Sequence, residues 1–153
     1  MTTAATELQQ GLEDLIEKLQ ALDAALERQR SEIQHGKPES IQIATSEVDR
    51  LLDEVVRLAD RMTGVARAQG ARVEDVARQL GLSSLYDTYR EAARRTDRSL
   101  QLNHRFIRRV YETNGAILRV LSGRQAEPVV YSDPLRGRQL KVDSSARFLD
   151  CNA

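Results

Sequence analysis

An apolar heptad pattern near the N-terminus constrains this chain more than any other feature. From Leu8 the seam positions are spaced alternately four and three residues apart, and they hold Leu8, Leu12, Leu15, Leu19, Leu22, Leu26, Gln29 and Ile33. Charged residues occupy half of the positions between them. This repeat is typical of an α-helix that buries one narrow seam against other helices. It predicts a helix from about Thr6 to His35.

A second heptad pattern follows the helix-breaking segment "HGKPES". Gly36 suits the position after a helix, and Pro38 can open the next one. The second seam holds Ile41, Val48, Val55 and Met62, with Leu51, Leu52, Leu58 and Val65 between them, and it ends near residues 69–70. Two helices of similar length joined by a short turn predict an antiparallel hairpin.

A third long helix is predicted after a short connecting helix in "RVEDVARQLG". Its seam runs through Leu85, Tyr89, Ala92, Thr96, Asn103, Phe106, Val110, Asn114, Ile117 and Leu121. Such a helix would be roughly 60 Å long. We therefore predict an all-α fold, an antiparallel bundle or coiled coil of three long helices, over residues 1–123. Residues 124–153 contain two prolines and no sustained period, which predicts an extended or mobile tail.

Two asparagines interrupt the third seam, and the second belongs to the turn dipeptide Asn114-Gly115. An 11-residue separation is within about 20° of a whole number of helical turns, so Asn103 and Asn114 share a face. The surrounding helical pattern outweighs the turn signal, at a cost of roughly 1 kcal/mol for the glycine. The amides can fix a register or an oligomeric state, as in coiled coils, or they can meet the backbone of a partner.

The apolar arc around these asparagines is wider than a two-helix seam needs. It spans about 180° of the helix, through Leu102, Phe106, Ile107, Val110, Tyr111, Ile117, Leu118 and Leu121. Part of this band is available to another chain, although a three-helix bundle could also cover it.

The charge distribution leaves two interpretations open. Residues 1–60 hold 6 Lys/Arg against 13 Asp/Glu, whereas residues 61–153 hold 17 against 10. The two parts can attract one another on packing, or the second can offer a basic surface to an acidic partner. The arginine-rich run from Arg90 to Arg109 invites a nucleic-acid interpretation, but Glu91 and Asp97 interrupt it and aromatic stacking platforms are missing. Arg94 and Arg95 could equally pair with the acidic first part.

Nothing in the sequence indicates catalysis or a cofactor. His35 and His104 fall in no pattern with metal-ligand spacing, and no catalytic or phosphate-binding motif is found. Cys151 is the single cysteine, which favours a reducing compartment. The N-terminus resembles no secretory signal, and no window is apolar enough to span a membrane. We therefore expect a cytoplasmic protein without metal or cofactor.

Residues 103–131 resemble the FlgN family of flagellar type III export chaperones. The shared parts are Leu102-Asn103, Phe106-Ile107, Asn114, "AILRVL" and a tail element "YSDPLRG" with Tyr131. The layout of two heptad helices followed by a long third helix is similar too.

The resemblance implies a chaperone that holds the hook–filament junction proteins FlgK and FlgL and brings them to the export gate protein FlhA. It implies client contacts on one face of the third helix, at Asn103, Phe106, Ile107, Val110, Tyr111, Asn114, Ile117, Leu118 and Leu121. Tyr131 would engage the export gate. The alternatives are a self-associating structural coiled coil and a nucleic-acid-binding helical protein.

Overall fold

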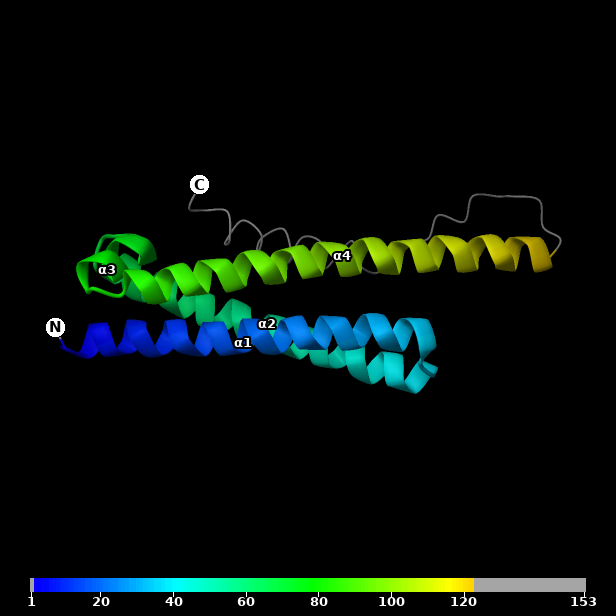
Figure 1. Ribbon diagram of the computed structural model, residues 1–153, viewed down its shortest axis with the longest axis horizontal. Helices are drawn as coiled ribbons and strands as arrows, with labels where there is room; N and C mark the ends of the chain where they lie inside the picture. The colour runs from blue at the N-terminus through cyan, green and yellow to red at the C-terminus, as the bar shows by residue number, and fades with distance from the viewer. Residues whose placement is uncertain (1, 123–153) are drawn as a thin grey trace. The chain divides into compact units, whose positions relative to one another are not determined.

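The computed structural model describes residues 2–122 and shows four α-helices there and no strand (Figure 1). These are α1 (Thr2–His35), α2 (Pro38–Ala68), α3 (Val73–Gln79) and α4 (Ser83–Leu121). The all-α prediction is confirmed. The predicted tail of residues 124–153, with Tyr131 and Cys151, lies outside the described residues.

The chain divides into two compact units, residues 1–99 and residues 100–153. The first contains α1, α2, α3 and the beginning of α4, and the second contains the remainder of α4. The domain boundary predicted at residue 123 stays a prediction.

Helices α1 and α2 form the predicted antiparallel hairpin. Lys18 Nζ lies 2.8 Å from Glu54 Oε2, and Gln29 Nε2 donates to Thr45 Oγ1 at 3.2 Å. Later residues of α1 therefore meet earlier residues of α2, as an antiparallel pair requires. The leucines of the α1 seam are all buried, at Leu8, Leu12, Leu15, Leu19, Leu22 and Leu26. This seam, predicted from spacing alone, is the centre of the core.

The ends of the helices follow local sequence signals, with two differences from the prediction. Helix α1 begins at Thr2 rather than near Thr6, because no proline or glycine precedes Gly11 to stop it. Gly36 follows α1 directly, but it does not adopt the left-handed backbone that glycine uniquely favours. Gly70 and Gly81 do, with φ of 69° and 73° after α2 and α3. Pro38 opens α2, as predicted.

The buried seams of α2 and α4 are rotated slightly from the predicted ones. In α2, alanines at 44, 59 and 66 are buried, whereas Val55 and Leu58 are only half-buried. In α4, Tyr86 and Ala93 are buried in place of Leu85 and Ala92. The reason is that apolar residues adjoin the seam on both sides, so the pattern permits two rotations. Packing selects the one that brings small alanines to the interface, where helices can approach closely.

Within residues 1–99, the beginning of α4 packs on α1. Thr96 Oγ1 donates to the carbonyl oxygen of Leu19 at 3.3 Å, and Arg95 Nε lies 2.8 Å from Asp23 Oδ2. Tyr86 and Tyr89 stack at a tilt, with ring centroids 5.8 Å apart, and burial raises the pKa of Tyr89. The Arg95–Asp23 ion pair joins the acidic first part of the sequence to the basic second part, as the internal-packing interpretation predicted.

Replacing Arg95 by alanine is expected to lower the free energy of unfolding by about 1–2 kcal/mol, measured by urea denaturation. Asp23 Oδ1 is buried and has no hydrogen-bond partner among the described residues, so Arg95 supplies the carboxylate's bond. The neighbouring exposed Arg94→Ala is the control and should have little effect. Adding Asp23→Ala to Arg95→Ala should restore part of the loss, because the unpaired carboxylate is gone. A double variant less stable than Arg95→Ala would contradict this role.

Candidate functional site

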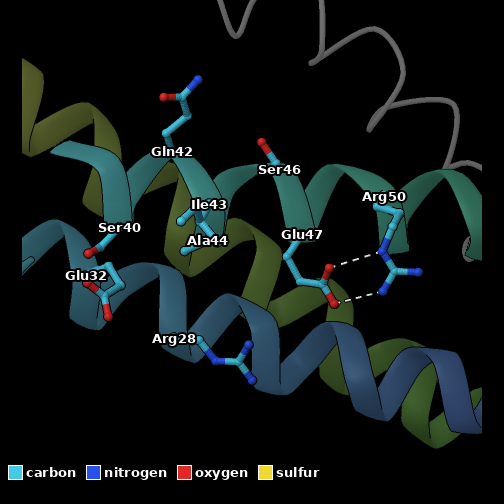
Figure 2. Close-up of a pocket in the computed structure, with 9 residues that line it drawn as sticks. All are labelled: Arg28, Glu32, Ser40, Gln42, Ile43, Ala44, Ser46, Glu47 and Arg50. Carbon is cyan, nitrogen blue, oxygen red and sulfur yellow. Dashed lines mark hydrogen bonds and ion pairs between the residues drawn. The ribbon is translucent and has the colours of Figure 1, made fainter. Parts of the chain in front are cut away.

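The first unit carries a shallow hollow between the end of α1 and the start of α2 (Figure 2). Its lining is Arg28, Glu32, Ser40, Gln42, Ile43, Ala44, Ser46, Glu47 and Arg50. Glu47 accepts two hydrogen bonds from Arg50, at 2.8 and 3.1 Å, and these hold the pKa of its carboxyl below the usual range. A carboxylate held ionised in this way is a poor proton donor at neutral pH. Glu47 is therefore not suited to act as a general acid in this hollow.

Residues 2–122 contain neither a candidate metal site nor a candidate membrane span. That part of the chain gathers no group of three or more His, Cys, Asp or Glu side chains able to hold a metal ion. None of its helices has an apolar stretch long enough to cross a membrane.

The second unit differs from the first in how much apolar surface it exposes. Of the eight large hydrophobic side chains that are exposed among the described residues, six lie on the last twenty residues of α4. They are Leu102, Tyr111, Ile117, Leu118, Val120 and Leu121. The segment that carries them, residues 102–121, is the yellow-green to yellow end of α4 in Figure 1. Contiguous exposed apolar side chains of this kind mark interaction surfaces.

Helical geometry places the predicted site residues on one side of α4. Taking Asn103 and Leu121 as the centre line, Val110 and Asn114 lie within about 20° of it and Ile117 within about 40°. Ile107, Leu118, Phe106 and Tyr111 lie within about 80° on either side. We call these nine residues the apolar face of α4.

Burial decreases along the apolar face toward the end of the helix. Asn103 is only 3% exposed, Phe106, Ile107 and Val110 are half-buried, and the members from Tyr111 onward are exposed. Asn103 and Asn114 therefore differ although they share a side of the helix. Asn103 is buried, and Asn114 is exposed to solvent. Tyr131, predicted to contact the export gate, lies outside the described residues.

Val120 is an exposed residue that the sequence pattern did not single out. It lies about 100° from the centre line and is 81% exposed. Because Val120 lies outside the heptad seam, the sequence pattern did not distinguish it from an ordinary surface residue. Leu102, eighteen residues earlier on α4, also lies about 100° from the centre line on the same side, so exposed apolar residues extend past the face on that side at both ends of this segment. On that side Arg109 lies about 120° from the centre line, and Arg105 lies about 160° from it, close to the opposite side of the helix.

Gly115 lies inside α4, which confirms that Asn114-Gly115 is helical here. Replacing Gly115 by alanine is expected to raise the free energy of unfolding of α4 by up to about 1 kcal/mol, through higher helix propensity. An added Cβ would meet only Arg119 Nη2, at 3.9 Å, so nothing opposes it. Thermal melting followed by circular dichroism measures the effect. Reduced helicity at residues 110–120 would instead show that this segment needs the glycine.

A model of a known protein family matches most of this chain. The family model described as "FlgN: FlgN protein" matches residues 1–136. Searches of curated proteins and of solved structures find no match. The matched range covers all four helices, including the whole apolar face of α4.

Proposed function

This chain belongs to the FlgN family, and from that premise we propose that it is a cytoplasmic export chaperone for the hook–filament junction proteins FlgK and FlgL. The family is one of flagellar chaperones rather than enzymes. The proposal adds three specific elements: the clients, the surface that binds them, and delivery to the export gate protein FlhA.

The observation that carries the proposal is the exposed apolar face of α4. Its outer members are Tyr111, Ile117, Leu118 and Leu121, and the side chain of each is about half exposed or more. They lie in the last part of α4, a helix of 39 residues. Side chains of this size gain roughly 1.5–3 kcal/mol each when fully buried. A complex in which a partner covers these side chains would therefore be strongly stabilised.

An amphipathic helix of the client fits this surface best. One helix buries an apolar stripe against another by interlocking side chains, and such binding needs no fixed catalytic geometry. Asn114 lies within the stripe and can set the register of the docked helix by hydrogen bonding, as buried asparagines do in coiled coils. Covering the client's apolar helix also prevents it from associating with other copies before export.

Two other functions can be weighed against the same surface. A self-associating coiled coil would use the apolar face to bind a second copy. A nucleic-acid binder would use the arginines of α4, but Arg95 is paired with Asp23 and Arg108 Nε with Glu112 Oε1 at 3.0 Å. These pairs reduce the positive charge available to phosphates. The apolar face, which nucleic acid would leave uncovered, favours a protein client.

Co-purification tests the function. Tagged chaperone is mixed with purified FlgK-like and FlgL-like proteins encoded by the same genome, each with and without its C-terminal helix. We expect a stable complex with the intact clients only. Equal retention of the truncated clients would show that the apolar face binds something other than their terminal helix.

Delivery to the gate is assigned to Tyr131. Tyr131→Ala is expected to weaken association with FlhA about thirtyfold, since burying a tyrosine ring contributes roughly 2 kcal/mol. Client affinity and thermal stability should not change. Surface plasmon resonance with the cytoplasmic domain of FlhA measures the loss, and Tyr131→Phe is the matched control. Reduced thermal stability with unchanged gate binding would show that Tyr131 serves the fold.

A further inference from the structure

The last part of α4 has a basic side opposite its apolar face. Residues 100–121 contain four arginines and a single acidic residue. On one side of the centre line, Arg109 lies about 120° away and Arg105 about 160° away. On the other side, Arg108 lies about 140° away and Arg119 about 160° away. All four side chains are exposed, so this side of the helix is positively charged.

Little of this positive charge is neutralised within residues 2–122. Arg108 Nε lies 3.0 Å from Glu112 Oε1, so that arginine is paired. The ion pairs among residues 2–122 include none with Arg105, Arg109 or Arg119. The basic side is therefore complementary to an anionic partner.

The apolar side of the same segment is wider than one docked helix can cover. Its exposed large side chains extend from Tyr111, about 80° from the centre line, to Leu102 and Val120, about 100° from it in the other direction. A helix docked along the centre line would cover a stripe of roughly 100°. It would leave Leu102 and Val120 in water, and it would not reach the arginines of the basic side. A partner that encloses the helix on several sides fits both features better.

We propose that the last part of α4 also binds the surface of a membrane rich in anionic lipids, as an amphipathic helix that lies in the plane of the interface. In that position the apolar side is buried about 5–10 Å into the boundary between headgroups and acyl chains. Headgroup phosphates then lie along both flanks, where the long arginine side chains can extend to meet them. Such a helix lies on the bilayer and does not cross it.

Other occupants match only one of the two sides. Nucleic acid would meet the arginines but leave the apolar side in water. A second copy of this chain could cover the apolar side but would bring no anions to the arginines. The membrane is a partner additional to the client of the proposed function, and binding to it does not depend on that function. Because both would cover Ile117 and Leu118, client and membrane should exclude one another.

Flotation of the full-length chain with lipid vesicles tests the charge requirement. Vesicles of phosphatidylcholine and phosphatidylglycerol in equal parts should bind the chain about a hundredfold more tightly than vesicles of phosphatidylcholine alone. High salt should reduce the preference. Arg105→Gln combined with Arg109→Gln should weaken binding to the anionic vesicles about thirtyfold. Arg57→Gln combined with Arg61→Gln is the matched control, because it removes the same charge from two exposed positions one turn apart on α2. It should leave binding unchanged.

Tryptophan fluorescence tests which side of the helix enters the lipid. The chain contains no tryptophan, so Val120→Trp supplies a single reporter on the apolar side. Its emission should shift to the blue when anionic vesicles are added. The emission of Ile43→Trp, a similarly exposed position on α2, should not shift.

Four results would overturn the inference. One is equal binding to the two kinds of vesicle, and another is binding to neither while the client is still bound, which would leave the proposed function standing. The third is a blue shift at position 120 that grows with protein concentration without lipid, which would indicate a second copy. The fourth is arginine-dependent binding of short duplex DNA without binding of vesicles. Vesicle binding by a chain that binds no client would support this inference and remove the proposed function.

Discussion

Ile117→Asp is expected to abolish the binding of FlgK and FlgL clients while the first unit stays folded. Ile117 lies near the centre of the apolar face and is 49% exposed in the free protein, so docking a client helix would bury it. A carboxylate placed there must lose its water without gaining a partner, which costs several kcal/mol. The affinity should therefore fall by about a hundredfold or more. Isothermal titration calorimetry with purified clients measures the loss.

Ile43→Asp is the matched control for this substitution. Ile43 is the same residue type, is 71% exposed, and lies on α2 beside the hollow of the first unit (Figure 2). It should leave client affinity unchanged. Circular dichroism should show unaltered helix content for both variants. A folded Ile117→Asp variant that binds both clients with native affinity would refute the assignment of the apolar face.

Leu15→Ala should lower the free energy of unfolding by about 3 kcal/mol, whereas Leu118→Ala should change it by less than about 0.5 kcal/mol. The two leucines both lie on heptad helices, but Leu15 is 1% exposed in the core between α1 and α2, and Leu118 is 60% exposed. Truncating Leu15 leaves a cavity in the core. Truncating Leu118 only reduces the amount of apolar surface that is exposed to solvent. Urea denaturation of residues 1–153 followed by circular dichroism provides the comparison.

The same pair should behave in the opposite way toward the client. Leu118→Ala is expected to weaken client binding, because docking of a client helix would bury the Leu118 side chain. Leu15→Ala should bind normally under conditions where the variant remains folded. If Leu118→Ala destabilised the free protein as much as Leu15→Ala, the apolar face would be a part of the core rather than a free surface.

Regular spacing made the helices of this protein predictable. The α1 seam from Leu8 to Leu26 is buried as the heptad pattern required, and Pro38 marks the start of α2. The pattern did not determine which of two adjacent apolar residues faces the core, because the helix could be rotated about its axis by one residue. In α4, Leu85 and Tyr86 are adjacent apolar residues, so either could lead the seam, and only packing shows that Tyr86 does.

The asparagines show a second limit of periodicity. Helical spacing places Asn103 and Asn114 on one side of α4, which the structure bears out. It cannot indicate that Asn103 is buried and Asn114 exposed, because burial depends on where neighbouring segments end. For the same reason, the sequence shows how many arginines α4 has, but not that Arg95 and Arg108 form ion pairs whereas Arg109 forms none within residues 2–122. An ion pair depends on the carboxylate that the fold brings near.

Site-specific photo-crosslinking can show whether the client helix lies on the apolar face of α4. A benzophenone amino acid replaces Ile117, or Ile43 as the control, and each variant is irradiated with purified FlgK or FlgL and analysed by mass spectrometry. We expect position 117 to crosslink to the client's C-terminal amphipathic helix and position 43 not to do so. Crosslinks from position 43 to that helix, with none from position 117, would contradict this expectation.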